Sequence, residues 1–255
     1  MVKSLFCFRL LLRVLPSDSC YKYFRATHVL LHRSARTLHH MIQFEDWGLI
    51  EYAVADQRQI DYVEQIKKGE RPSTLVFCQH PTVITAGRAT EDGHVITNNE
   101  RLRALGIDVV SNNRGGDVTV HNPGQLVGYP LFHLSHFNED LHWFLREIEE
   151  CIIQTLAQYH ITGHRIDGLT GVWVDNSRKI CAIGIHCSRW VISHGFALNV
   201  VNDTSAFGHI IPCGIADKSV TSISEELGYA VDFHEVAKVC KEITSTRFQE
   251  VKKNL

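Results

Sequence analysis

The sequence predicts an α+β or mixed α/β fold. Segments rich in β-branched residues follow one another directly in several places, and segments with the apolar spacing of amphipathic helices lie among them. A doubly wound nucleotide-binding fold is not favoured, because neither Gly-x-Gly-x-x-Gly nor a phosphate-loop spacing occurs. The composition, 44% hydrophobic and 21% charged, is that of an ordinary globular domain.

The first half of the body is expected to contain a helix, two strands, a short helix and a further strand. Asp46 can cap the first helix by accepting backbone N–H groups, and Gly69 can end it. Apolar and β-branched residues fill the strand segments, and His80-Pro81 turns the chain between the first two strands. These elements are predicted at about residues 46–68, 74–78, 82–85, 99–105 and 107–110.

In the second half, a glycine turn at Arg114-Gly115-Gly116 opens a strand, and residues 126–134 are expected to form its hairpin partner. Asn138 can cap an amphipathic helix, and Asp175-Asn176-Ser177 can turn the chain between two strands. The remaining elements are predicted as a helix at 138–159, strands at 171–174, 179–185 and 190–200, a short helix at 205–210 and a final helix at 232–248.

The charge distribution separates residues 1–40 from the body. This head contains seven Lys or Arg residues and a single acid, Asp18, whereas residues 41–255 are acidic overall. A basic, serine-containing head with spaced leucines is typical of a mitochondrial targeting segment. One alternative is a disordered basic tail. Another is a secretory signal or membrane anchor, but Arg9 and Arg13 interrupt the apolar run that either would need. We expect residues 1–40 to be a removed or disordered matrix-targeting segment and residues 41–255 to be a single catalytic domain.

The other bulk features exclude several classes of function. A formal net charge of −2 gives no support for nucleic-acid binding. A membrane-spanning helix needs a run of about 18 apolar residues, and the sequence has none. The cysteines outside the head are scattered through apolar stretches, which suits buried free thiols better than a disulfide framework. The histidine and cysteine spacings match no metal-binding pattern, so no metal site is expected.

Two residues are candidates for catalysis. Cys213 lies between Pro212 and Gly214, and Lys179 follows a tight turn at the start of an apolar run. A free thiol with a pKa of about 8.5 is mostly protonated at neutral pH, and a nearby ammonium group lowers that pKa. If the fold brings the two together, they form a thiolate–ammonium nucleophile, although a buried small thiol and a solvated surface lysine are the ordinary alternatives. His121 and His194 are alternative bases.

A series of motifs in a fixed order indicates the family more specifically than Cys213 or Lys179 does alone. In their order, the motifs closely resemble the lipoyl(octanoyl) transferases, which transfer octanoyl from acyl carrier protein to other proteins and belong to the biotin/lipoate protein ligase superfamily. The resemblance covers about residues 42–230. The motifs are Arg114-Gly115-Gly116-Asp117-Val118-Thr119-Val120-His121-Asn122-Pro123-Gly124-Gln125, Thr170-Gly171-Val172-Trp173-Val174, Lys179-Ile180-Cys181-Ala182-Ile183-Gly184, His194-Gly195-Phe196-Ala197-Leu198-Asn199-Val200 and Ile211-Pro212-Cys213-Gly214, with His80-Pro81 to Gly87-Arg88 upstream.

The resemblance implies a mixed sheet flanked by helices and an octanoyl-thioester enzyme. Cys213 would carry the acyl group, and Lys179 would lower its pKa. His194 is a further candidate. Residues of three segments would line the acyl substrate: Arg114, Gly115, Gly116, Asp117, Val118, Thr119, Val120 and His121; Ala182, Ile183 and Gly184; and Gly195, Phe196 and Ala197.

The implied partners are acyl carrier protein and lipoyl-domain proteins, namely the glycine cleavage H protein and E2 subunits of 2-oxo acid dehydrogenases. The carrier is usually acidic, and Arg88, Arg114 and Arg165 are candidate contacts for it. The resemblance also implies a monomer that needs neither ATP nor a metal. Three positions depart from the family pattern: Asp117 replaces the usual glutamine, Val120 an aromatic residue and Asn122 a glycine.

Three alternatives remain open from the sequence. An ATP-dependent lipoate-protein ligase on the same fold would make an acyl-adenylate and would need no cysteine at position 213. A cysteine thioesterase would pass the acyl group to water. A non-catalytic acyl-carrier binding protein would have an unreactive Cys213.

Overall fold

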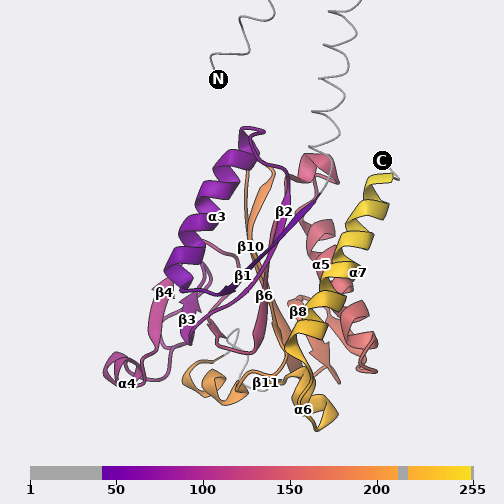
Figure 1. Ribbon diagram of the computed structural model, residues 1–255. Helices are drawn as coiled ribbons and strands as arrows, with labels where there is room; N and C mark the ends of the chain where they lie inside the picture. Colours follow the sequence, from indigo (N-terminus) through magenta and orange to yellow (C-terminus); the bar gives the residue numbers. More distant parts are fainter. Residues whose placement is uncertain (1–41, 212–217, 254–255) are drawn as a thin grey trace, which may run out of the picture. The chain divides into compact units, whose positions relative to one another are not determined.

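The computed structural model describes residues 42–211 and 218–253, and these contain two sheets (Figure 1). The larger sheet is mixed, with the strand order β1-β2-β6-β10-β9-β8-β7 and β11 paired to β9. Its strands are β1 (Gln43–Leu49), β2 (Thr74–Gln79), β6 (Gln125–Leu131), β7 (Gly163–Ile166), β8 (Leu169–Val174), β9 (Arg178–Ser188), β10 (Val191–Asn199) and β11 (Ser219–Val220). The smaller sheet has the order β4-β3-β5 and consists of β3 (Val83–Ala86), β4 (Asp108–Ser111) and β5 (Thr119–His121). The mixed α/β prediction is confirmed.

Helices cover both faces of the larger sheet (Figure 1). Helix α3 (Tyr52–Lys67) packs on one face, and α5 (Leu141–Ala157) and α7 (Phe233–Lys253) pack on the other. Strand β6 lies between β2 and β10 and is buried along its whole length. Shorter helical segments connect the strands: α4 (Asn99–Ala104), η1 (Leu134–His136), η2 (Thr204–His209) and α6 (Ile223–Leu227).

Period-two alternation along the strands divides the core into two layers. On β2, Leu75 and Phe77 face the cluster formed with α5 and α7, whereas Val76 and Cys78 face the cluster formed with α3. A third cluster, around Ile84, belongs to the smaller sheet and includes residues of η2. The same side-chain alternation along β5 later decides which residues of that strand reach the functional site.

The helix predicted from residue 46 begins later than expected, because residues 43–49 form strand β1. Gly48 has a φ of +60°, which a right-handed helix does not accommodate. The Asp46 carboxylate accepts the Gly48 N–H at 2.8 Å, so it stabilises a local turn instead of capping a helix. Helix α3 starts only at Tyr52.

Two other details of the prediction are wrong. Strands β5 and β6 are not hairpin partners: β5 pairs with β3 in the smaller sheet, and β6 pairs with β2 and β10. The cap of α5 is Asp140, whose carboxylate accepts the N–H groups of His142 and Trp143, and not Asn138. Strand β7 and helix α6 were not predicted. Strands β1 and β11 were not predicted either, and the remaining strands and the final helix lie near their predicted positions.

Close backbone contacts at glycine hold the centre of the larger sheet together. A Cβ on Gly195 of β10 would lie 2.0 Å from the Gly128 carbonyl oxygen on β6. A Cβ on Gly128 would lie 2.2 Å from Cζ of Phe196, whose ring covers this glycine. Phe196 is itself 3% exposed and contacts Phe77 edge-on, so its ring has little room to move. Neither glycine can carry a side chain without displacing this layer.

Gly128→Ala should therefore destabilise the protein by about 1–3 kcal/mol, the usual cost of overpacking a core. The measurement is urea denaturation. Gly208→Ala is the matched control, because nothing lies within 4 Å of a Cβ at that position, and its effect should stay within about 0.5 kcal/mol. Equal stability of the two variants would contradict the packing described for Phe196.

Candidate active site

A cavity of about 500 Å³ opens between the two sheets, beside the loop that leads into β5. Strands β6, β8, β9 and β10 contribute to its wall, as do Tyr52 of α3 and the turn between β7 and β8. Part of the wall is apolar, and the residues there are Val118, Val127, Ile183, Phe196, Ala197, Phe207 and Val220. Charged and polar groups lie on the remaining wall, so the cavity suits a ligand with a hydrocarbon portion and a polar portion.

Most of the residues predicted to bind substrate line this cavity. They come from distant parts of the chain that the sheet brings together, and they are Arg114, Gly116, Asp117, Val118, Thr119, His121, Ala182, Ile183, Gly184, His194, Gly195, Phe196 and Ala197. The predicted catalytic Lys179 also lines it. The predicted nucleophile, Cys213, lies outside the described residues.

Two predicted lining residues do not line the cavity. Val120 is fully buried in the core of the smaller sheet with Ile84, because side chains alternate along β5 and only its neighbours Thr119 and His121 reach the cavity. Gly115 instead donates its N–H to the Ile185 carbonyl at 2.8 Å. That N–H is therefore not a donor for a substrate oxyanion.

Lys179 is almost completely removed from solvent, with 6% of its surface exposed. Its Nζ lies 4.5 Å from the centre of the Trp173 ring on the adjacent strand β8. An ammonium group over an indole face is attracted by the ring quadrupole, and burial strengthens this attraction. The backbone of Lys179 is fixed from the other side, because its carbonyl accepts the N–H of Thr221 and it pairs with Val220 of β11.

His121 is buried, and its neighbours determine which ring nitrogen donates a hydrogen bond. The Gln125 amide donates to the Val120 carbonyl and to Asn199, so its oxygen faces His121 Nδ1 at 2.8 Å and must accept from it. The imidazole ring also stacks on Tyr52. Burial lowers the pKa of His121 to about 3, and the nearby His80 contributes in the same direction. The imidazole is therefore neutral at physiological pH.

His194 also lines the cavity and is likewise neutral. It adopts a left-handed φ of 56°, and its N–H donates to the Gln59 side chain of α3 at 2.8 Å. Its Nε2 lies 2.7 Å from the side-chain oxygen of Asn113 in the glycine-rich loop. Burial lowers the pKa of His194 to about 4, with a further contribution from Arg114. Helix α3 thus holds a backbone conformation that is unfavourable for a residue with a side chain.

The candidate arginines differ in their surroundings. Arg114 is 8% exposed, and its guanidinium donates to the carbonyl and hydroxyl of Thr85 at 2.6 and 3.0 Å. Arg165 pairs with Glu149 and Glu150 of α5. Arg88 is exposed next to the glycine-rich loop and donates its backbone N–H to the Arg114 carbonyl. Arg88 and Arg165 are thus exposed on the surface, whereas Arg114 is buried.

Two of the positions that depart from the family pattern have specific contacts. Asp117 lies 2.7 Å from His94 Nδ1, and this hydrogen bond raises the pKa of His94. Asn122 donates to the Asp203 carbonyl and accepts from Asn202, which ties the end of β5 to the chain that leads into η2. Asp117 and His94 line the cavity, whereas Asn122 lies outside its wall.

Sequence reasoning missed several residues of the wall. Tyr52 lies on the apolar face of α3 and Tyr129 in a buried strand, so each looks like an ordinary core aromatic residue in the sequence. His80, which lay within the upstream motif, bonds the Tyr129 hydroxyl at 2.7 Å behind the wall. His94 lies in a loop without a recognisable motif. Among the described residues, no group of His, Cys, Asp and Glu could hold a metal ion.

Comparison with known proteins agrees with the predicted family and fold. Residues 51–244 match the family model of the lipoyl protein ligase A/B catalytic domain. A protein of Cytophaga hutchinsonii named octanoyltransferase is 45% identical over 213 residues, which covers 75% of this chain and 86% of the relative. An octanoyltransferase of Rubrobacter xylanophilus is 47% identical over 206 residues, covering 80% and 90%.

Solved structures with low sequence identity share the fold. Lipoate-protein ligase A bound with ATP superposes with a TM-score of 0.61 at 13% identity, covering 84% of this chain and 93% of that chain. A bipartite lipoate protein ligase from Thermoplasma acidophilum gives a TM-score of 0.62 at 15% identity, covering 85% and 92%. The ordered motifs of the sequence predicted this relationship, and the comparisons confirm it. The chain belongs to the lipoyl protein ligase A/B catalytic domain family, among relatives named octanoyltransferases.

Proposed function

We propose that the protein transfers an octanoyl group from acyl carrier protein to the acceptor lysine of a lipoyl domain, through a thioester on Cys213. The observation that carries the proposal is a buried lysine, Lys179, in the wall of a cavity with an apolar side. The described residues on either side of the Cys213 segment support it. Ile211 donates its N–H to the His94 carbonyl at 2.8 Å, and Val220 pairs with Lys179, while His94 and Val220 both line the cavity.

The apolar wall provides the free energy that holds the acyl chain. Burial of about six methylene groups at about 0.8 kcal/mol each contributes roughly 5 kcal/mol, before the cost of ordering the chain. Val127 of β6 and Ala197 of β10, which face the same side of the larger sheet, are suited to this contact. The carbonyl end of the substrate then lies toward the polar wall.

The first step forms the acyl-enzyme. Cys213, as thiolate, attacks the octanoyl thioester carbonyl and its sulfur–carbon bond forms. The bond to the phosphopantetheine sulfur breaks, and that sulfur leaves as a thiol with a proton from the Lys179 ammonium, which becomes a neutral amine. One thioester replaces another, so this step is close to balanced. The acceptor lysine, as neutral amine, then attacks the octanoyl-Cys213 carbonyl, the amide forms, and the Cys213 thiolate is regenerated.

We assign two roles to Lys179: as an ammonium it stabilises the Cys213 thiolate, and as the neutral amine left after the first step it accepts the proton of the attacking lysine. A general base works best when its pKa lies near the operating pH. The pKa values of His121 and His194, about 3 and about 4, leave both imidazoles poor proton acceptors at neutral pH. Their contacts with Gln125 and Asn113 fit a role in shaping the polar wall instead.

The proposed reaction needs neither ATP nor a metal ion, because the octanoyl thioester is already activated. An ATP-dependent ligase remains the second candidate, supported by the shared fold with lipoate-protein ligase A bound with ATP. The names of the relatives near 45% identity favour the transferase. We further propose that the lipoyl-domain acceptors are the glycine cleavage H protein and E2 subunits, acting on a monomeric enzyme.

Cys213→Ser should abolish octanoyl transfer and the covalent adduct, because a hydroxyl is a far weaker nucleophile than a thiolate at neutral pH. The measurement is intact mass after incubation with octanoyl-acyl carrier protein, without ATP, followed by addition of a lipoyl domain. The wild-type protein should gain one octanoyl group and pass it to the domain. An octanoyl adduct that persists in the variant contradicts the assignment, and release of free octanoate alone identifies a thioesterase.

Lys179→Ala should raise the pH at which Cys213 is alkylated by about 1 unit or more, because a neighbouring ammonium favours the thiolate. Iodoacetamide labelling of Cys213, followed by peptide mass spectrometry between pH 6 and 9, measures the effect. The buried Cys181 is an internal control for overall unfolding. An alkylation profile identical to that of the wild type would remove Lys179 from this role.

We also propose mitochondrial matrix import, on the basis of the basic head at residues 1–40. Protein expressed in eukaryotic cells should co-purify with mitochondria and should have lost an N-terminal segment of about this length. Replacement of Arg9 and Arg13 by glutamate should leave it outside mitochondria. An intact N-terminus on protein recovered from the matrix would contradict removal of the segment.

A further inference from the structure

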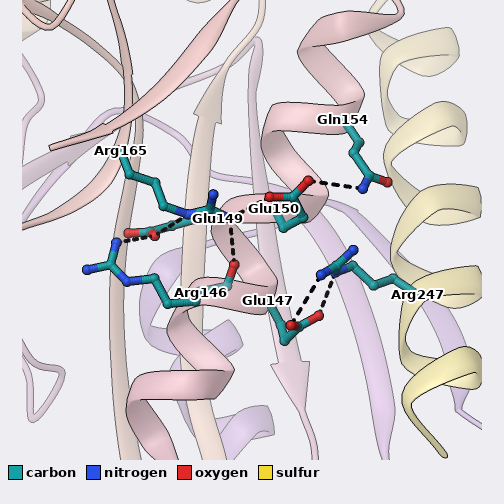
Figure 2. Close-up of polar contacts among 7 residues, drawn as sticks. All are labelled: Arg146, Glu147, Glu149, Glu150, Gln154, Arg165 and Arg247. Carbon is teal, nitrogen blue, oxygen red and sulfur yellow. Dashed lines mark hydrogen bonds and ion pairs between the residues drawn. The ribbon is translucent and has the colours of Figure 1, made fainter. Parts of the chain in front are cut away.

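A buried carboxylate lies on the side of α5 that faces the β7–β8 hairpin (Figure 2). Glu149 is 1% exposed, and both of its oxygens are engaged. One oxygen accepts from Arg146 at 2.7 Å and from Arg165 at 3.1 Å, and the other accepts the backbone N–H of Gly171 at 3.1 Å. Arg165 belongs to β7 and Gly171 to β8, so a single side chain of α5 binds both strands of the hairpin.

The geometry of this buried carboxylate is more constrained than that of an ordinary surface ion pair. Removing a carboxylate from water is costly unless its oxygens are paired, and here three donors from two strands and one helix supply the pairing. Arg165 is fixed further by Glu150 at 2.6 Å and by the Arg146 carbonyl at 3.0 Å. The hairpin is therefore held to α5 in one position.

Gly171 connects this carboxylate with the active site. It has a φ of +126°, a conformation that residues with side chains rarely adopt. A Cβ at this position would lie 2.7 Å from the Cys181 carbonyl oxygen and 3.6 Å from Cε of Lys179, so the lysine stem runs directly past Gly171. Two residues further along the same strand, Trp173 supplies the ring beneath the Lys179 ammonium. The hairpin turn, residues 168–170, also lines the cavity.

We infer that Glu149 is a positioning residue for octanoyl transfer: by binding Gly171 and Arg165, it fixes the hairpin against which the Lys179 side chain is aligned. The inference rests on the proposed function of Lys179. Glu149 has no contact with the cavity itself, since it is not among the residues of the wall. Its effect is transmitted through backbone and packing, and misplacement of a catalytic group by about 1 Å can cost up to about 100-fold in rate.

Glu149→Gln is the principal test, because an amide has one oxygen and cannot accept from Gly171 and both arginines together. We expect kcat for octanoyl transfer to fall by about 10-fold or more, with a much smaller change in KM for the carrier substrate. Acetylation of Lys179 by an N-hydroxysuccinimide ester, mapped by peptide mass spectrometry, should rise several-fold as the lysine becomes less confined. Glu149→Ala is the second variant, since the amide of E149Q retains one oxygen for the Gly171 N–H.

Glu147→Gln is the matched control on the same helix. Glu147 is also paired with an arginine, but with Arg247 of α7, on the side of α5 away from the hairpin (Figure 2). E147Q should leave kcat and Lys179 acetylation unchanged when both variants are assayed well below their melting temperatures. If E149Q and E147Q behave alike in both measurements, Glu149 has only a structural role and the inference is wrong.

The labelling measurement also separates this inference from the proposed function. If Lys179→Ala retains wild-type kcat, the proposed role of Lys179 fails, whatever the position of its side chain. A rise in Lys179 acetylation confined to the Glu149 variants would still support the positioning role in that case. Unchanged acetylation together with a strong effect of Lys179→Ala would overturn the positioning role and leave the proposed function standing.

Discussion

The rest of the site depends on the burial of one ammonium group. Lys179 lies in the interior of a mixed sheet, where a charge is costly unless nearby groups compensate for lost water. The fold compensates with the indole face of Trp173 and fixes the lysine backbone through β11. These contacts come from two strands other than its own, so the lysine is correctly placed only when β8 and β11 are assembled with β9. A buried cation next to a cavity is a local source of stabilisation for a thiolate, and this is the property on which the proposed chemistry relies.

The cavity walls show how one sheet serves both halves of the substrate. Glycine backbones at Gly128 and Gly195 let β6 and β10 approach closely, and Val127 and Ala197 of these two strands contribute to the apolar wall. The polar wall is held by α3, which stacks Tyr52 on His121 and binds the backbone of His194 through Gln59. Because both histidines are held neutral by burial, the charges around the cavity are supplied by lysine, arginine and the His94–Asp117 pair. Apolar residues such as Val127 and Ala197 thus lie on the same face of the larger sheet as α3, which holds the polar wall.

The sequence predicted the family, the fold class and most cavity residues, because the ordered motifs mark strands whose glycines and polar residues meet in the folded sheet. The sequence-based prediction was wrong where a local pattern is compatible with two different structures. Asp46 looks like a helix cap, but Gly48 adopts a positive φ and the segment becomes β1. Val120 belongs to the motif predicted to bind substrate, but its side chain points into the core because side chains alternate along β5. Tyr52 and Glu149 could not be found from motifs, since their importance comes from contacts with strands far away in the sequence. Cys213 itself lies outside the described residues, so its role is a proposal, which the flanking residues support.

The most direct test of the account is a crystal structure of the protein carrying octanoyl on Cys213. The account predicts that the Cys213 sulfur lies within about 4–6 Å of Lys179 Nζ, the range over which an opposite charge stabilises an ionised group. It also predicts that the octanoyl chain contacts Val127 and Ala197 along the apolar wall. A sulfur well beyond that distance from Lys179, or an acyl chain bound outside the cavity, would contradict it.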